Sequence, residues 1–177
     1  YAALEGIDPA LKVSEAFMVR NQPRWIRLRE ILRGDEYGAP LTFSSLLSFM
    51  MTNDQDFRQK PEWGGGAYYD LGSYTAMAAR YVFDAEPRRV MALMQRNAAG
   101  IDLFTSVIMD FGDGRQATFM VSLAQASSQS IQIVCERAFI TLPQAYVPSR
   151  KEPNLIQIDT SADHANSQIT TLEFPAL

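Results

Sequence analysis

Cysteine and histidine are nearly absent from this sequence. Its 177 residues include one cysteine, Cys135, and one histidine, His164. A lone cysteine excludes an internal disulfide, and a lone histidine in the turn-like stretch SADHANS cannot build a His-rich metal site. Cys135 alternates with Ile131 and Ile133, so we expect it to fill core or interface space. We expect no bound metal.

Long apolar runs and an excess of positive charge are missing too. No apolar run approaches the roughly 20 residues of a membrane-spanning helix, so no membrane partner is expected. The net charge of −4 and the pI near 5.0 argue against a protein that binds nucleic-acid phosphates. With 47% hydrophobic and 20% charged residues, the chain has the composition of a folded domain with a sizeable core.

The sequence has no nucleotide-binding glycine motif, although three glycines stand together at 64–66. Counting from Gly64 and Gly66, the third glycine of a dinucleotide fingerprint falls on Tyr69, and a polar loop (51–66) precedes the run instead of a strand. We therefore expect this chain alone to bind neither NAD nor NADP. The glycines can instead bring backbone close to a ligand or a neighbouring domain and turn the chain sharply into a helix.

Hydrophobic periodicity predicts more strands than helices. Helices are expected at 24–34, after Pro23, and at 67–83, and arginines would form the solvated face of the first. FGDG at 111–114 predicts a tight hairpin turn. Consecutive strands favour the α+β class, with an open, largely antiparallel or mixed sheet and helices on one face. The expected strands are 11–19 (buried), 41–50, 88–96, 103–111, 115–124, 130–136, 137–142, 155–159 and 168–174.

The strand at 115–124 alternates between two faces of different character. One face is apolar and suits the core: Ala117, Phe119, Val121 and Leu123. The other is small, uncharged and suited to contact with a flat surface: Gln116, Thr118, Met120, Ser122 and Ala124. We interpret the second face as available for a homodimer or higher homo-oligomer, and the alternative is a face that is merely solvated.

Asp70 and Tyr74 are four residues apart in the second expected helix, so their side chains should share one side of it. Each has an ordinary explanation. A carboxylate near a helix N-terminus is favoured by the helix dipole, and a half-buried tyrosine is common in cores. A phenol titrates near pH 10 and needs a nearby cation to exchange protons near neutrality. Spacing alone leaves a catalytic pair and a structural pair both open.

Several motifs together resemble the C-terminal domain of the Gfo/Idh/MocA oxidoreductases. They are EAFMVRNQP (15–23), the loop with Arg58, GGGAYYDLGSY (64–74), and the AEP turn with the strand after it. The resemblance extends from about Val13 to about Leu142. It is greatest to the branch with glucose–fructose oxidoreductase, xylose dehydrogenase and dihydrodiol dehydrogenase, which has tyrosine where many members have histidine.

The resemblance implies a second domain that this sequence does not contain. Family members have an N-terminal Rossmann domain that binds NAD or NADP, with the substrate lying between the two domains. Residues 1–20 would be the linker and last strand of that missing domain. Residues 21–177 would form the substrate and oligomerisation domain, without the terminal helix usual in the family. The family's catalytic lysine, in an upstream EKP-type motif, is absent, since Lys60-Pro61 lies in another loop.

The resemblance also implies roles for particular residues. Tyr74 would exchange a proton with the substrate hydroxyl or carbonyl, and Asp70 would bind substrate or orient the pair. Arg20 and Arg58 would lie on the substrate side or between the domains. Gly66 would contact substrate, and Glu15 would contact the cofactor of the missing domain.

These observations predict the substrate-side and oligomerisation domain of an NAD(P)-dependent oxidoreductase acting on a sugar or a cyclic diol or polyol. The fragment alone would be inactive, and a cytoplasmic location is expected. The alternative is a non-catalytic partner-binding or scaffold module with the same fold.

Overall fold

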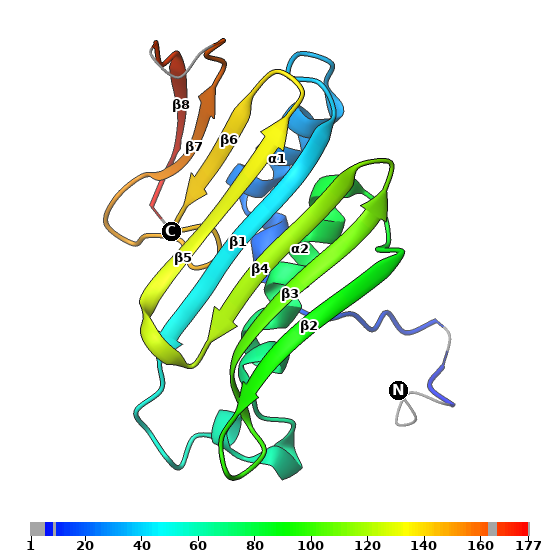
Figure 1. The fold of residues 1–177 in the computed structure, drawn as a ribbon, viewed down its shortest axis with the longest axis vertical. Helices are drawn as coiled ribbons and strands as arrows, with labels where there is room; N and C mark the ends of the chain where they lie inside the picture. Colours follow the sequence, from blue (N-terminus) through cyan, green and yellow to red (C-terminus); the bar gives the residue numbers. More distant parts are fainter. Residues whose placement is uncertain (1–5, 9, 163–165, 177) are drawn as a thin grey trace.

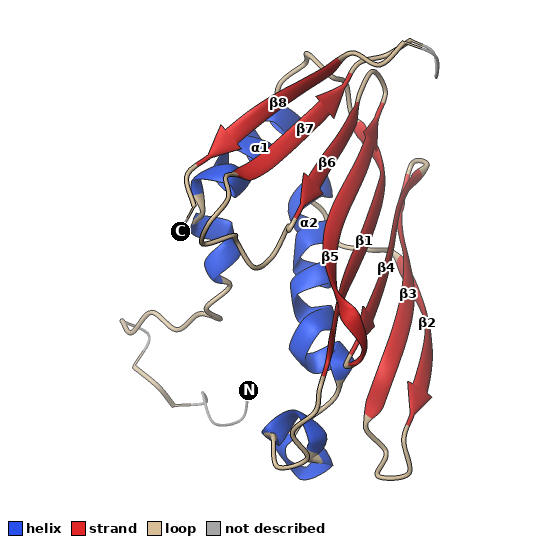
Figure 2. Cartoon of the chain, turned by 90° about the vertical axis from the view of Figure 1, so that its left-hand side faces the viewer, coloured by secondary structure: helices blue, strands red, loops and turns tan. Residues whose placement is uncertain are grey.

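One open sheet of eight strands, with two helices on one of its faces, makes up the fold (Figure 1 and Figure 2). The structure is a computed structural model that describes residues 6–8, 10–162 and 166–176. The elements are α1 (Pro23–Arg33), β1 (Pro40–Met50), α2 (Ser73–Phe83), β2 (Arg89–Arg96), β3 (Asp102–Gly112), β4 (Arg115–Ser122), β5 (Ala124–Cys135), β6 (Phe139–Pro143), β7 (Asn154–Asp159) and β8 (Ile169–Phe174). Short 3-10 turns lie at Met18–Asn21, Phe57–Gln59 and Pro61–Trp63, and a π-helical turn at Tyr68–Gly72 precedes α2.

The strand order β2-β3-β4-β1-β5-β6-β7-β8 places β1 at the centre of the sheet. Every neighbouring pair is antiparallel except β1 and β4, which are parallel. A loop and α2 lead the chain from β1 to the edge strand β2, and β3 and β4 bring it back to β1 (Figure 1). The expected α+β class, with an open, mixed and largely antiparallel sheet, is confirmed.

The core lies between the sheet and the two helices. One row of paired side chains runs across six strands on the helix side and is almost fully buried: Met109, Ala117, Phe43, Ile133, Ile140 and Ile158. The apolar face predicted for the strand at 115–124 is confirmed, since Ala117, Phe119, Val121 and Leu123 are all buried. Ser122 was expected on the opposite, open face, but it is buried and donates to the carbonyl oxygen of Leu103 at 3.0 Å.

The expected buried strand at 11–19 is wrong. Residues 12–17 have no regular secondary structure, and the side chains of Leu11 and Val13 are 63% and 60% exposed. The segment leaves the sheet as an extended arm (Figure 1), and no described strand pairs with it. Its apolar residues satisfied a strand pattern, but a strand also needs a neighbour for its backbone hydrogen bonds. Within the expected strand only Val19, in the 3-10 turn, is fully buried.

Arg24 is buried at the start of α1, which corrects the expectation that all the arginines of 24–33 lie on a solvated face. Its guanidinium donates to the carbonyl oxygens of residues 143–145 at 2.9–3.2 Å. Burial lowers the pKa of Arg24 to about 10. These carbonyls lie at the end of β6 and in the turn after it, where Gln144 has a φ of 52°. The start of α1 thus supplies donors to a segment that is distant in the sequence.

A buried carboxylate attaches the start of the α2 segment to the sheet. Asp102, the first residue of β3, accepts hydrogen bonds through Oδ2 from the backbone N–H of Tyr68 at 2.8 Å and the hydroxyl of Thr105 at 2.7 Å. Gly66 lies against the same carboxylate with a φ of +124°, and a Cβ there would stand 2.1 Å from Oδ1 of Asp102. Only glycine fits this position, because the close contact and the backbone conformation both exclude a side chain.

We expect Gly66→Ala to destabilise the fold more than Gly64→Ala. Both glycines have positive φ, which costs an alanine about 1–2 kcal/mol. A Cβ at Gly64 meets nothing within 4 Å, whereas one at Gly66 displaces Asp102 from its hydrogen bonds, a loss of about 1–3 kcal/mol more. Urea unfolding of both variants measures the difference. An equal loss for the two substitutions would contradict the contact.

Candidate functional site

Tyr74 lies in the first turn of α2 and is partly exposed. Its ring makes edge-on contacts with Phe17, at 5.3 Å between ring centroids, and with Tyr146, at 6.5 Å. The two tyrosines differ at their hydroxyls. Tyr146 is buried, its hydroxyl lies 2.6 Å from Ser45 Oγ, and burial raises its pKa. Among the described residues, the Tyr74 hydroxyl has no hydrogen-bond partner, so this phenol keeps its hydrogen-bonding capacity.

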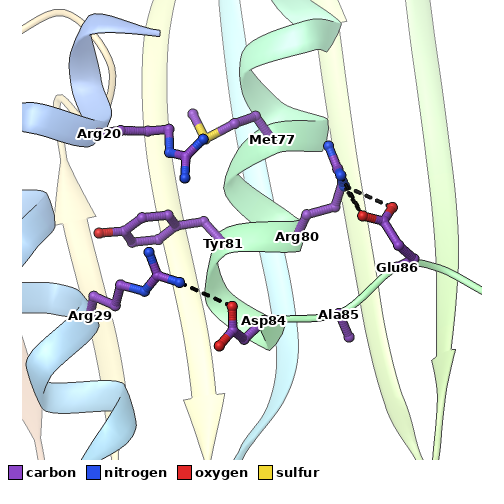
Figure 3. Close-up of a pocket in the computed structure, with 8 residues that line it drawn as sticks. All are labelled: Arg20, Arg29, Met77, Arg80, Tyr81, Asp84, Ala85 and Glu86. Atoms are coloured by element: carbon purple, nitrogen blue, oxygen red, sulfur yellow. Dashed lines mark hydrogen bonds and ion pairs between the residues drawn. The ribbon is translucent and has the colours of Figure 1, made fainter. Parts of the chain in front are cut away.

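The N-terminal arm brings two more of the predicted residues to the same side of α2. Glu15 and Arg20 line a depression of about 570 Å³ together with Phe17, which also contacts Tyr74. Arg20 also lines a second pocket, of about 310 Å³, beside Tyr81 (Figure 3). Tyr81 lies seven residues beyond Tyr74, two turns further along the helix. The structure thus gathers Glu15, Arg20 and Tyr74 along one side of α2.

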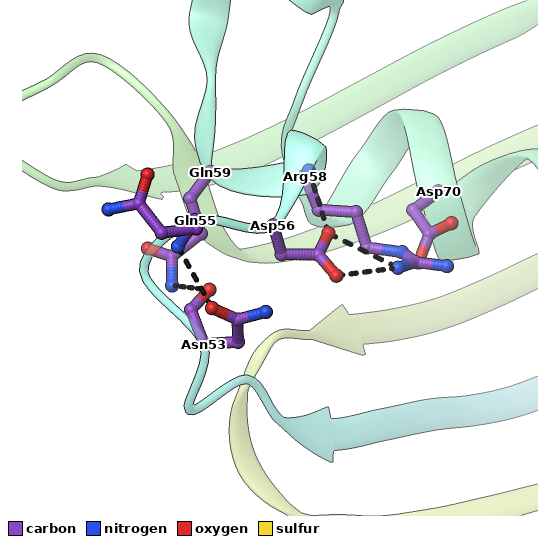
Figure 4. A network of polar contacts seen from close by, with 6 residues as sticks. All are labelled: Asn53, Gln55, Asp56, Arg58, Gln59 and Asp70. Atoms are coloured by element: carbon purple, nitrogen blue, oxygen red, sulfur yellow. Dashed lines mark hydrogen bonds and ion pairs between the residues drawn. The ribbon is translucent and has the colours of Figure 1, made fainter.

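Asp70 and Arg58 form an ion pair at the start of the α2 segment (Figure 4). Arg58 Nε donates to Asp70 at 2.7 Å, and Arg58 Nη1 donates to both carboxylate oxygens of Asp56 at 3.2 Å. Partial burial acts to lower the pKa of Arg58, but the attraction of Asp70 and Asp56 outweighs it and raises the pKa. This clamp, Asp56–Arg58–Asp70, fastens the 51–66 loop to the π-helical turn. The carboxylate of Asp70 accepts from Arg58 and, within the described residues, makes no hydrogen bond to the hydroxyl of Tyr74.

The third predicted substrate residue, Gly66, is buried, and the position that a Cβ would take there is occupied by the carboxylate of Asp102. Its neighbour Gly65 is equally close to its own chain, since a Cβ there would stand 2.4 Å from the carbonyl oxygen of Arg58. Contacts within the chain therefore explain Gly65 and Gly66, whereas Gly64 is explained by its positive φ of 71°. The assignment of Gly66 to substrate binding stays a prediction, as do the roles of the other five residues.

Sequence reasoning missed three residues that shape this site. Asp56 stands two residues before Arg58 and also accepts from its backbone N–H at 3.0 Å, a local signal that could have been recognised as a turn cap. Phe17 and Asp102 gave no such signal, because their contacts with Tyr74 and Tyr68 join segments far apart in the chain.

The glycine run at 64–66 does not form a phosphate-binding loop for a dinucleotide. Phosphates bind where backbone N–H groups of a glycine loop point outward at a helix start, but Gly66 here packs on a buried carboxylate. In the described ranges, no three potential metal-ligating side chains gather in one place, and His164 lies outside those ranges. None of the described helices has the length and hydropathy of a membrane-spanning segment.

Comparison with known proteins places this geometry in a family. The family model described as the GFO/IDH/MocA C-terminal domain matches residues 25–141. The chain is 32% identical to an uncharacterised oxidoreductase of Rhizobium meliloti, over 90% of this chain and 48% of that protein. It is 26% identical to a dTDP-3,4-didehydro-2,6-dideoxy-alpha-D-glucose 3-reductase of Saccharopolyspora spinosa, over 84% of this chain and 45% of the reductase. The chain thus spans about half the length of these curated relatives.

Solved structures share the fold at low sequence identity. A variant of a 3-ketoreductase from Actinomadura kijaniata, in complex with TDP-benzene and NADP, superposes with a TM-score of 0.82 at 16% identity, over 94% of this chain and 50% of that one. An aldose-aldose oxidoreductase from Caulobacter crescentus, complexed with glycerol, gives a TM-score of 0.75 at 16% identity, over 91% of this chain and 47% of that one. At such identities the likeness shows the fold alone.

The family match covers α1 from residue 25, α2, β1 to β5, the Arg58 loop and the turn that carries Asp70. It confirms the resemblance drawn from the motifs, and the chain belongs to the GFO/IDH/MocA C-terminal domain family.

Proposed function

We propose that this chain is the substrate-side domain of an oxidoreductase that reduces a sugar carbonyl or oxidises the corresponding hydroxyl, the substrate class being a sugar or related polyol. One observation carries the proposal: the partly exposed phenol of Tyr74 has no hydrogen-bond partner among the described residues, beside a helix start held by the Asp56–Arg58–Asp70 clamp. The relatives support the substrate class, since one is a reductase of a dTDP-linked sugar.

Tyr74 is the residue that exchanges a proton with the substrate. During reduction its hydroxyl donates a proton to the carbonyl oxygen, and in the reverse direction the phenolate accepts one. Positioned proton transfer of this kind accelerates a reaction by about 10²–10⁴. A phenol needs a nearby cation for this work. Arg58 is already paired with two carboxylates, so the cation comes from elsewhere, which agrees with the catalytic lysine that the resemblance places upstream.

Asp70 contributes to this reaction indirectly, because it helps to hold the helix start that carries Tyr74. Its carboxylate is bonded to Arg58 at 2.7 Å, so it is committed to holding the loop against the helix start. Arg58 in turn serves the clamp through Nε and Nη1 and contacts the ring of Phe57 at 4.7 Å. A clamp of this kind keeps Tyr74 in one orientation, and small displacements of a reacting group are costly to the rate.

The cofactor of the whole protein is NAD or NADP, which supplies or takes up a hydride. The proposal assigns its binding to a domain outside this chain, because the glycines at 64–66 offer it no phosphate site. Solved neighbours in complex with NADP are consistent with this arrangement. Glu15, on the N-terminal arm, is the residue of this chain proposed to contact that cofactor, and its position in the depression lined by the arm supports this role.

The open face of the sheet is proposed as a homodimer contact. On this face β2 and β3 pair Met91 with Ile108 and Leu93 with Ser106, and the second pair continues through Met120 to β1. The side chains of Met91 and Leu93 are 71% and 75% exposed. Contiguous exposed apolar side chains on a flat surface mark an interaction site, and a second copy presents the same surface.

Replacing Tyr74 with phenylalanine in the oxidoreductase that contains this chain should lower kcat by about 10²–10⁴ and change KM little, because it removes the proton donor and keeps the ring contacts. Tyr69→Phe is the matched control, since Tyr69 is an exposed tyrosine of the preceding turn. Steady-state kinetics measure both. Full activity of Tyr74→Phe would reject the proton-transfer role and favour the alternative of a non-catalytic partner-binding module.

Met120→Glu should convert the dimer to monomer, because it places two charges opposite each other in a dry sheet contact. Sedimentation velocity at tens of micromolar measures the assembly state. Arg27→Glu on the exposed side of α1 is the control that leaves the dimer intact. A monomeric unsubstituted protein, or a dimer that persists with Met120→Glu, would contradict the contact.

A further inference from the structure

A pocket of about 310 Å³ lies beside the second half of α2 and faces α1 and the 3-10 turn at Met18–Asn21 (Figure 3). The proton-transfer step proposed for Tyr74 does not use it. Its charged and aromatic lining is Arg20, Arg29, Arg80, Tyr81, Asp84 and Glu86. We call it the arginine pocket.

Positive charge exceeds negative charge around the arginine pocket, although the chain as a whole carries −4. Asp84 is shared between two arginines, accepting from Arg29 at 3.0 Å and from Arg33 at 3.1 Å. Glu86 serves Arg80, which donates from Nε at 2.8 Å. Within the described ranges Arg20 has no carboxylate partner. Three guanidinium groups of the lining therefore face two carboxylates, one of which, Asp84, is also shared with Arg33 outside the lining.

The arginines also have unused hydrogen-bonding capacity. Nε of Arg29 is buried and has no acceptor among the described residues. The guanidinium of Arg20 makes no hydrogen bond to any described residue, and it lies over the ring of Tyr81. Buried donors without an acceptor are unfavourable, and guanidinium groups bind phosphate oxygens particularly well. The pocket thus has the charge and the free donors that an anionic ligand needs.

Tyr81 lies between the guanidinium group of Arg20, which is unpaired among the described residues, and that of Arg29, which is paired through Nη2 with Asp84. Its hydroxyl donates to the carbonyl oxygen of Trp25 at 2.9 Å, which sets the ring orientation. The guanidinium carbon of Arg20 lies 5.9 Å from the ring centroid and that of Arg29 lies 4.8 Å from it. Figure 3 shows the ring between the two groups. Two cations separated by a ring suit two linked phosphates, one for each guanidinium, better than a single phosphate.

We propose that the arginine pocket binds the diphosphate of a nucleotide-type ligand, with Arg20 and Arg29 as the anion-binding residues. Tyr74 lies two turns away on the same helix, about 10 Å at ~1.5 Å per residue. One elongated ligand can therefore place a neutral sugar at Tyr74 and its diphosphate in the arginine pocket. This second step, a nucleotide-linked sugar as substrate, rests on the proposed function, whereas the anion site itself does not.

Calorimetric titration of inorganic pyrophosphate into the protein that contains this chain tests the site directly. We expect saturable binding that weakens as salt is raised and falls at least about tenfold in Arg20→Gln, whose side chain has no other described polar contact. Arg27→Gln is the matched control, since Arg27 lies on α1 with Arg29 but is exposed and paired with Glu30. Absence of binding, or equal binding by Arg20→Gln and Arg27→Gln, would overturn the proposal.

Competition experiments identify the source of the diphosphate. Thymidine diphosphate that displaces pyrophosphate, with a loss of affinity in Arg20→Gln, supports a nucleotide-linked sugar, and displacement by NADP alone supports the dinucleotide cofactor. Displacement by neither would overturn the nucleotide-type ligand. Tyr74→Phe should leave pyrophosphate affinity unchanged. Failure of the proton-transfer role would therefore appear in turnover and failure of the anion site in binding, so the two remain distinguishable.

Discussion

The hydrogen bonds of Asp102 are the contact on which the site depends. A buried carboxylate is unfavourable unless donors satisfy it, and here the backbone N–H of Tyr68 and the hydroxyl of Thr105 do so. Because Asp102 begins a strand and Tyr68 begins the π-helical turn, these bonds fix the helix start relative to the sheet. Gly66 is glycine because that carboxylate occupies the space of a side chain.

The helix that starts at this contact sets the positions of everything proposed above. Its first turn carries Tyr74, whose hydroxyl has no partner in the part of the chain that the structure describes, while that of the neighbouring Tyr146 is bonded to Ser45. Two turns later Tyr81 lies between Arg20 and Arg29 beside a pocket with excess positive charge. The two proposed sites, for proton transfer near the start of α2 and for anion binding near its end, therefore lie along one side of a single helix.

Local patterns predicted most of the fold and the composition of the site. The FGDG turn formed as expected, with positive φ at Asp113 and Gly114, and both helices and the apolar face of the strand at 115–124 were confirmed. The predictions that were wrong concern features that depend on contacts between distant segments. The arm at 11–19 needed a partner strand, and burial of Arg24 depends on carbonyls in the turn after β6. The ion pair between Arg58 and Asp70 could likewise not be predicted from the sequence, although both residues were candidate site residues.

The most direct test of this account is the rate of an Asp102→Ala variant in the whole oxidoreductase, beside a Thr105→Val control that leaves the bond to Tyr68 in place. The account predicts that Asp102→Ala remains folded by circular dichroism but loses about 10² in kcat, because a displacement of about 1 Å at the helix start misplaces Tyr74. A folded Asp102→Ala enzyme with the kcat of the Thr105→Val control would contradict it.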